Sequence, residues 1–242
     1  MKITNCFWEQ VNIGKRTVEI TVEATDSFSL DMLNNACNGY DYLVVKVPMN
    51  KPSFNFGLSN MGFTCIENQM TVIKAYKDFD FYKLSSLYNI TSYEVVNSED
   101  SLNSVLYSIT PGMFSTDRIS LDSQFGLEIS CRRYKNWLTT EYRNGKSRLI
   151  KVMYDGQHVG FMLTRIESQK IHLLLNGLYK SFQGRKLGLL TPSSPLMYAH
   201  KENMDIIEEI TSISSNNIPV VKLYDRLGFH LHEQHYVFVK HK

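Results

Sequence analysis

The 242-residue sequence lacks the features that mark several specialised protein classes. No stretch is apolar over the ~18 residues that a membrane-spanning helix needs, and the first residues lack the apolar core of a signal peptide. The 26 Lys and Arg residues nearly balance the 24 Asp and Glu residues, and the basic residues around Arg185 and Lys186 are too few for a nucleic-acid surface. Trp8 and Trp137 fit core packing better than a stacking platform. We expect a cytoplasmic protein with neither a membrane nor a nucleic acid as its partner.

The four cysteines are few and scattered, and they form no C-x-x-C pair. A disulfide or zinc framework is therefore not indicated, and reduced, buried thiols are expected. The segment 232–235 (HEQH) is one residue short of the H-E-x-x-H zinc motif and falls on an expected strand, so we expect no metal. Neither G-x-S-x-G nor a P-loop motif occurs, which leaves hydrolases and P-loop NTPases without support.

The C-terminal half has clear hydrophobic periodicity. Asp155-Gly156 is a hairpin turn signal, and Asn217 and Gly228 are suited to begin and end a helix. A mostly antiparallel sheet with helices makes the expected fold class α/β, more fully a mixed α+β sheet protein. The pattern predicts a helix over 125–144, strands over 147–154, 158–166 and 170–179, an irregular helical region, a strand over 210–214, a helix over 217–228 and a strand over 229–240.

The N-terminal half is less regular. It predicts strands over 16–24 and 42–48, a helix over 30–37, a turn at 60–63 and a strand at 71–73. Thr110-Pro-Gly punctuates the chain between the halves. We therefore predict two domains, 1–112 and 113–242.

A weak internal repeat relates the two halves. The segment 62–67 (GFTCIE) aligns with 228–233 (GFHLHE) at a shift of 166 residues. The same shift pairs Lys74 with Lys240 and Leu58 with Tyr224. The match is either a coincidence or the trace of two related halves, of which only the second carries the tyrosine.

Two segments in the C-terminal half resemble a known family. The segment 217–229 (NIPVVKLYDRLGF) resembles the N-x-x-A-x-x-L-Y-x-x-x-G-F signature of the GNAT superfamily of acyl-CoA-dependent N-acyltransferases, with Val220 at the usual alanine. The segment 183–188 (QGRKLG) resembles the pyrophosphate loop of that family, Q/R-x-x-G-x-G/A, with Lys186 in place of the first motif glycine and Gly188 kept. Such a loop works because consecutive backbone N–H groups that open a helix can hold phosphates.

The layout further resembles the two-domain bacterial nucleotide-sugar N-acyltransferases, such as dTDP-fucosamine acetyltransferase. The segment 115–122 (STDRISLD) and Trp137 stand where those proteins have an S-x-x-R-[FI]-x-x-D-like stretch and a helix with a tryptophan. The resemblance implies a GNAT fold with a splayed sheet, preceded by a smaller, degenerate GNAT-like α/β domain. It also implies transfer of an acetyl or larger group, such as hydroxybutyryl, from acyl-CoA to a dTDP-linked amino-deoxysugar, for lipopolysaccharide or capsule biosynthesis. A homodimer is among the assemblies that it allows.

The resemblance also implies roles for individual residues. Tyr224 would protonate the leaving thiolate after direct attack of the amine on the thioester, because a phenol of pKa about 10 can donate to a thiolate whose thiol has a pKa of about 8.5. Asn217 would hydrogen-bond the pantetheine arm or an ordered water, and backbone N–H near Leu178 would polarise the thioester carbonyl. No general base is evident. The expected donor-binding residues are Leu178, Gln183, Gly184, Arg185, Lys186, Leu187, Gly188 and Asn217; the expected acceptor-binding residues are Arg118, Asp122, Arg133 and Asn176.

Each role has a plain structural alternative. Tyr224 could be a half-buried helix residue, Asn217 only a helix cap, and the arginines members of surface ion pairs. Two other functions also remain open. One is N-acetylation of another amine, such as an amino acid, a peptide or an antibiotic. The other is a non-catalytic module that binds coenzyme A or a nucleotide, in which Lys186 has spoiled the phosphate loop.

Overall fold

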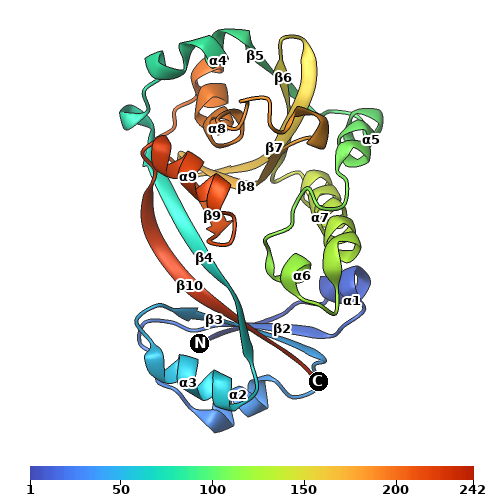
Figure 1. The fold of residues 1–242 in the computed structure, drawn as a ribbon, viewed down its shortest axis with the longest axis vertical. Coiled ribbons are helices and arrows are strands. Elements are labelled where there is room, and N and C mark those ends of the chain that lie inside the picture. The colour runs from blue at the N-terminus through green and yellow to red at the C-terminus, as the bar shows by residue number, and fades with distance from the viewer.

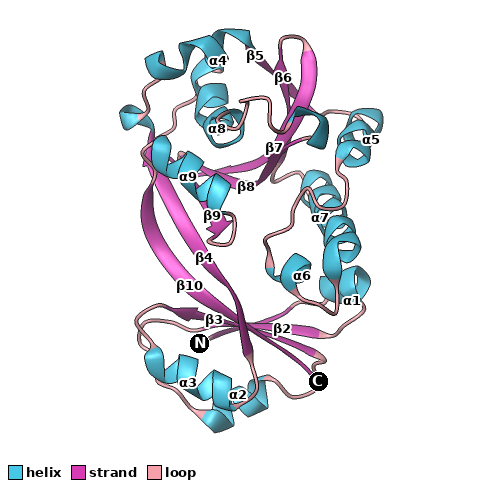
Figure 2. Ribbon diagram, viewed as in Figure 1, coloured by secondary structure: helices cyan, strands magenta, loops and turns pink.

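The computed structural model describes all residues, 1–242, and its strands form a single ten-stranded sheet in the order β1-β2-β3-β10-β4-β9-β8-β7-β6-β5 (Figure 2). The strands are β1 (Lys2–Asn5), β2 (Thr17–Thr21), β3 (Tyr42–Pro48), β4 (Thr64–Ala75), β5 (Thr91–Val95), β6 (Arg148–Tyr154), β7 (Gln157–Glu167), β8 (Lys170–Leu178), β9 (Glu208–Ser214) and β10 (His230–His241). The α-helices are α1 (Trp8–Ile13), α2 (Leu30–Ala36), α3 (Pro52–Asn60), α4 (Ser85–Ile90), α5 (Glu99–Ser108), α6 (Arg118–Leu121), α7 (Gly126–Arg143), α8 (Leu190–Lys201) and α9 (Ile218–Arg226). None of these helices has the length and apolar character that crossing a membrane requires.

The element order predicted for the C-terminal half is confirmed, from α7 through the meander β6-β7-β8 to α8, β9, α9 and β10. Local signals explain this agreement, because Asp155 and Gly156 both have positive φ in the turn between β6 and β7. The N-terminal half is richer than predicted. It also contains β1, α1 and α3, and β4 is much longer than the predicted strand at 71–73.

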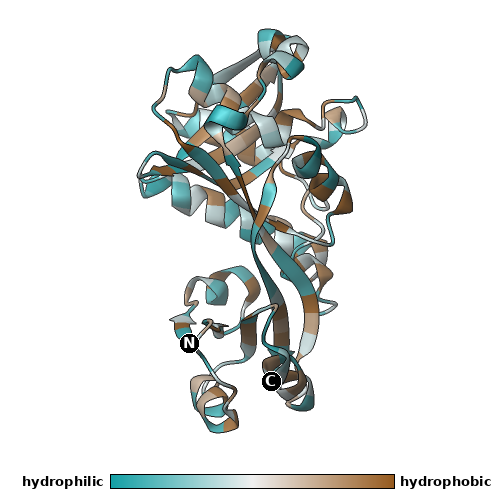
Figure 3. Cartoon of the chain, turned by 90° about the vertical axis from the view of Figure 1, so that its left-hand side faces the viewer, coloured by the Kyte–Doolittle hydropathy of each residue, from teal (hydrophilic) through white to brown (hydrophobic).

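The two halves exchange their last long strands. Strand β4 pairs with β9 and β10, whereas β10 pairs with β3 and β4, so each strand inserts into the sheet of the other half. Both extend from beside α9 in the upper lobe down into the lower lobe and connect the two (Figure 1). Seen from the side, these strands carry hydrophilic stretches where they join the lobes (Figure 3). The division at 112/113 stays a prediction, and β10 lies within the sheet of the N-terminal half.

The pairing of the exchanged strands matches the internal repeat, because the residues paired at its centre are equivalent at the shift of 166 residues. Gln69 pairs with His235, its own equivalent at the shift of 166 residues, and their outer neighbours Ser214 and Pro48 are equivalent as well. The repeated lysines also act alike. Lys74 Nζ donates to the Gly228 carbonyl at 3.2 Å, and Lys240 Nζ donates to the carbonyl of Met61, next to Gly62, at 2.6 Å. The repeat therefore reflects two related halves around a pseudo-twofold axis between β4 and β10.

Helices cover both faces of the sheet, and neighbouring strand residues show which face is which. In β7, Phe161 packs with Leu138 of α7, whereas Met162 packs with Leu190 of α8. Successive residues of a strand point to opposite faces, so α7 and α8 lie on opposite sides of the sheet.

Three cysteines are buried and Cys65 is exposed, and none is paired.

Candidate active site

Strands β8 and β9 separate partway along their length, as predicted. They pair in parallel only from Lys170 with Glu208 to Leu173 with Thr211. At the same point the pairing of β7 with β8 shifts register, so that Leu174 has no partner in β7. Such a bulge bends a strand and increases its twist, which accounts for the separation. The residues of β8 after Leu173 therefore have no paired strand on the side that faces β9.

A cavity of about 1390 Å³ opens at this separation and is lined from both faces of the sheet. Asp122, Gly184, Arg185, Lys186 and Leu187 do not line it. It brings together eight of the predicted site residues: Arg118, Arg133, Asn176, Leu178, Gln183, Gly188, Asn217 and Tyr224.

Tyr224 reaches the cavity from α9. The side chain of Asn217 caps this helix by accepting a hydrogen bond from the Val220 N–H at 3.4 Å. Tyr224 is only 3% exposed, and its ring packs edge-on against Phe229 with the centroids 4.8 Å apart. Burial, and then the nearby Glu209, raises the pKa of this phenol, so it carries its proton at neutral pH. It is therefore a proton donor at the wall of the cavity.

Glu209 is a fully buried carboxyl group behind this tyrosine that sequence reasoning missed. It is 0% exposed, and neither carboxyl oxygen has a hydrogen-bond partner. Burial raises its pKa well above the usual range. Glu209 does not line the cavity, and among the site residues it acts on Tyr224, whose pKa it helps to raise.

The predicted phosphate loop lies just before α8, with a backbone like that of a glycine loop. Lys186 has φ +63°, the left-handed conformation that its replaced glycine would favour, and Gly184 has φ +78°. Gln183 Nε2 donates to the Leu178 carbonyl at 3.2 Å, which ties the loop to the end of β8. A Cβ on Gly188 would come within 3.3 Å of the Leu223 side chain, so this glycine allows α9 to approach.

Two other loop residues are held by packing. Leu187 is buried in the core beside α8, so only its backbone can face a ligand. The Arg185 guanidinium lies 5.1 Å from the centre of the Phe182 ring.

The predicted acceptor residues have protein partners. Arg118 and Arg133 both bind the fully buried Glu9 carboxylate, at 3.2 and 2.8 Å. Asn176 Nδ2 donates to the Thr191 carbonyl in α8 at 2.8 Å. Asp122 lies away from the cavity, because its carboxylate contacts His241 Nε2 at 2.7 Å near the end of β10.

The N-terminal half also contributes to the cavity wall, which sequence reasoning missed. Glu19 of β2, Lys46 of β3 and Glu67 of β4 line it. Trp8 is 42% exposed on α1 and lines the cavity with Trp137, so the expectation of core packing was wrong for Trp8. Alternation along β2 and β4 could have placed the glutamates on one face, but no pattern showed which face meets a cavity. No group of three or more His, Cys, Asp or Glu side chains is placed to hold a metal ion.

Comparisons with known proteins show similarity of structure only. No protein-family model matches the sequence, and a search of curated proteins found no match. A tandem GNAT protein from the clavulanic acid biosynthesis pathway is 13% identical with a TM-score of 0.58, covering 93% of this chain and 75% of that one. A GCN5-related N-acetyltransferase from Sphaerobacter thermophilus is 11% identical with a TM-score of 0.56 over 83% of this chain, and the chain spans 59% of its length.

A third similar structure is a glucosamine N-acetyltransferase region of a fungal multi-domain β-N-acetylglucosaminidase. It is 9% identical to this chain with a TM-score of 0.62, and the match covers 94% of this chain and 30% of that one. All three have TM-scores above 0.5 with this chain, although none is more than 13% identical to it. The chain therefore has the fold of the GCN5-related N-acetyltransferases, with two related halves joined in one sheet.

Proposed function

We propose that this protein transfers an acyl group from acyl-CoA to the amino nitrogen of an acceptor. The observation that carries the proposal is the protonated Tyr224, which lines a large cavity at the point where β8 and β9 separate. A thioester carbonyl held between these strands would have a proton donor on one side and open cavity on the other. The shared fold supports the same activity.

The donor would approach from the side of α8 and α9. The loop 183–188 would hold the coenzyme phosphates with its backbone N–H groups at the start of α8, and Arg185 and Lys186 supply positive charge beside it. The pantetheine arm would use the backbone groups of β8 that β9 leaves unpaired, ending near Leu178.

The reaction forms one C–N bond, breaks one C–S bond and moves protons at both groups. The neutral amine nitrogen attacks the thioester carbonyl and forms the C–N bond, after which the C–S bond breaks. The leaving thiolate takes the proton of the Tyr224 hydroxyl, and the phenolate regains a proton from solvent. The amine gives up its proton to a base or to water, so an amide and free coenzyme A are the products.

The acceptor that we propose first is a dTDP-linked amino-deoxysugar, as the sequence resemblance implies. Arg118 and Arg133 line the cavity, and guanidinium groups suit phosphate oxygens. A similar fungal structure is described as a glucosamine N-acetyltransferase, which supports an amino sugar. The reaction would then take place in the cytoplasm and serve the synthesis of surface polysaccharide.

A second acceptor class is favoured by a specific observation. Glu19, Glu67 and Asp117 line the same region and would repel a diphosphate, and Glu9 already occupies both guanidinium groups. A cationic amine without phosphates, such as an amino acid or a peptide, would avoid this repulsion.

Two measurements test the proposal. Acetyl-CoA and longer acyl-CoAs should raise the melting temperature, since a ligand at a hundredfold excess over its Kd adds about 2.7 kcal/mol of stability. Release of coenzyme A should then be followed with a thiol reagent against dTDP-amino sugars, glucosamine, amino acids and short peptides. Stabilisation without turnover of any amine would favour a module that only binds the coenzyme. Absence of both would refute the proposal.

A further inference from the structure

We propose that Glu67, from the N-terminal half of the chain, binds the ammonium group of the acceptor and takes its proton. This inference rests on the proposed acyltransferase function and names the base that the reaction needs. It makes the N-terminal half part of the catalytic site, although that half carries no equivalent of Tyr224.

Glu67 and α9 lie on different faces of the sheet. Glu67 is the cross-strand partner of Val237 in β10, so the two side chains share a face, and Val237 packs against Ile119 of α6. Tyr224 instead packs with Val72 and Phe229 in the small core under α9. Both Glu67 and Tyr224 line the one cavity, so they approach the gap between β8 and β9 from opposite faces.

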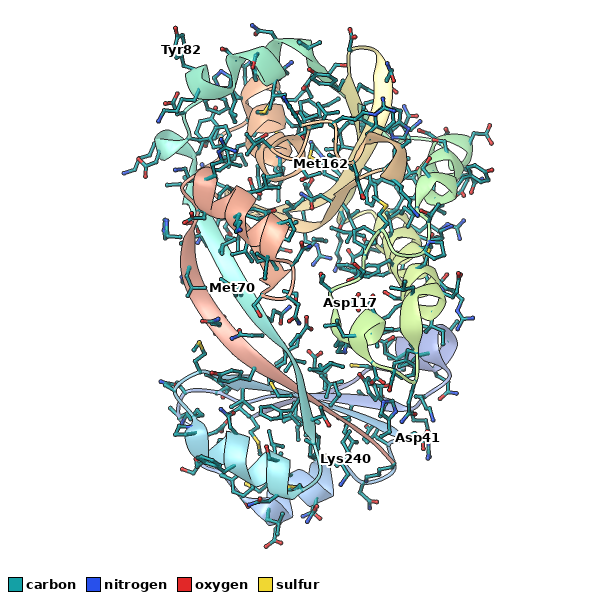
Figure 4. All side chains as sticks on the ribbon, in the orientation of Figure 1. Asp41, Met70, Tyr82, Asp117, Met162 and Lys240 are labelled. Atoms are coloured by element: carbon teal, nitrogen blue, oxygen red, sulfur yellow. The ribbon has the colours of Figure 1, made fainter.

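This arrangement matches the demands of acyl transfer. The nucleophile attacks the carbonyl carbon from the face where its proton is removed, and the sulfur leaves on the side where a proton is supplied. Asp117 lines the cavity on the same side as Glu67, and in the view of Figure 4 it lies between β4 and α7. The acceptor would occupy this part of the cavity, between β4 on one side and α6 and α7 on the other.

Among the carboxylates that line the cavity, Glu67 is the one available for a cation. Glu19 pairs with Lys46 at 3.0 Å. Glu141 is bound to Arg165, and Asp117 accepts the Ile119 N–H at the start of α6. Neither Asp117 nor Glu67 forms an ion pair, but Asp117 also accepts hydrogen bonds from the Ser120 and Ser130 hydroxyls, which leaves Glu67 as the carboxylate available to a cation.

The groups around Glu67 suit a base. Burial raises its pKa, and the Asp117 carboxylate adds to this effect. The nearby Ser214 hydroxyl and the charges of Arg118 and Lys46 act on this pKa in the opposite direction. A raised value brings the pKa of the carboxyl group closer to the pKa of an amine, which makes proton transfer from the ammonium ion less unfavourable.

The proton balance is simple. The acceptor enters as an ammonium ion, and one of its protons passes to the Glu67 carboxylate, directly or through one water. The freed lone pair forms the C–N bond as the C–S bond breaks, and Tyr224 protonates the thiolate. Glu67 then releases its proton to solvent, and Tyr224 takes one up.

The test compares Glu67→Gln with the wild-type protein, using the amine of the above panel that gives the fastest release of coenzyme A. Loss of a general base should lower kcat/KM at neutral pH by about 100-fold or more. The deficit should shrink as the pH rises toward the pKa of the amine, about 8 for the α-amino group of a peptide and about 10 for a lysine-type amine, because solvent then supplies the neutral amine. Glu67→Asp should restore part of the rate, and aniline, which is unprotonated at neutral pH, should be affected much less than an alkylamine.

Two controls separate this inference from the function on which it depends. Glu233→Gln changes the residue equivalent to Glu67 in the other half, which is exposed on β10 and outside the cavity, and it should leave turnover unchanged. The shift of melting temperature by acetyl-CoA should be the same in all variants. A Glu67→Gln protein with the kcat/KM and pH profile of the wild type would overturn the role of Glu67 while keeping the transferase. Absence of turnover by the wild type with every amine would overturn both.

Discussion

Replacement of Tyr224 by phenylalanine separates catalysis from folding at this site. The variant keeps the ring that packs edge-on against Phe229 and removes one hydroxyl group. The neighbouring polar groups keep other partners, since Thr211 Oγ1 donates to the Leu173 carbonyl at 3.0 Å. Asn176 likewise keeps its bond to α8. The change should therefore cost no more than about 1 kcal/mol of stability.

The effect on the rate should be much larger. A positioned proton donor contributes typically 10²–10⁴-fold, so kcat should fall by about 100-fold or more. The affinity for acyl-CoA should stay nearly the same, because in the proposed binding mode the loop 183–188 and backbone groups of β8 hold the coenzyme, and Tyr224 does not. Stopped-flow release of coenzyme A gives kcat, and the melting temperature with and without acetyl-CoA gives stability and binding. An unchanged kcat in Tyr224→Phe would refute the role of the phenol, and loss of coenzyme binding would show that it acts on the donor instead.

Three further changes test the physical reasoning elsewhere. Glu209→Met should stabilise the protein at neutral pH, because folding raises the pKa of Glu209. Above the unfolded pKa of about 4.3, the unfolded chain has lost a proton that the folded protein keeps, so a rise in pH favours unfolding of the wild type. In urea titrations the advantage of the methionine variant should therefore grow as the pH rises from about 4 to about 7. Glu9→Gln should lower the free energy of unfolding by about 3–5 kcal/mol, because it leaves Arg118 and Arg133 without their buried counter-charge; a loss below 1 kcal/mol would show that water replaces it. Lys186→Gly should raise that free energy by up to about 1 kcal/mol by relieving the left-handed conformation, and a decrease would mean that the lysine side chain contributes its own contacts.

Local signals in the sequence predicted much of the C-terminal half. Caps, turns and periodicity act between residues a few positions apart, and so Asn217, Gly228 and the hairpin at 155–156 were readable. The separation of β8 and β9 was expected from the family resemblance, and the bulge at Leu174 gives its physical cause.

The rest of the fold depends on contacts between distant segments. The insertion of β4 and β10 into each other's sheets pairs residues more than 130 positions apart, such as Gln69 with His235, and no local pattern specifies such a partner. The weak repeat was the only trace of it. Glu67 was missed for the same reason, because alternation along a strand tells which residues share a face but not what lies opposite that face.

The exchange of strands also has a consequence for how the protein is made. Strands β3 and β4 are not paired with each other; β10 lies between them in the sheet, and it follows every other element along the chain. During synthesis the N-terminal half therefore emerges with two open strand edges, and it cannot close its sheet when its own residues are complete. Domains commonly fold one after another as the chain leaves the ribosome. We therefore expect the sheet to be completed only after residues 230–241 have been made, and we expect neither half alone to form the sheet seen here.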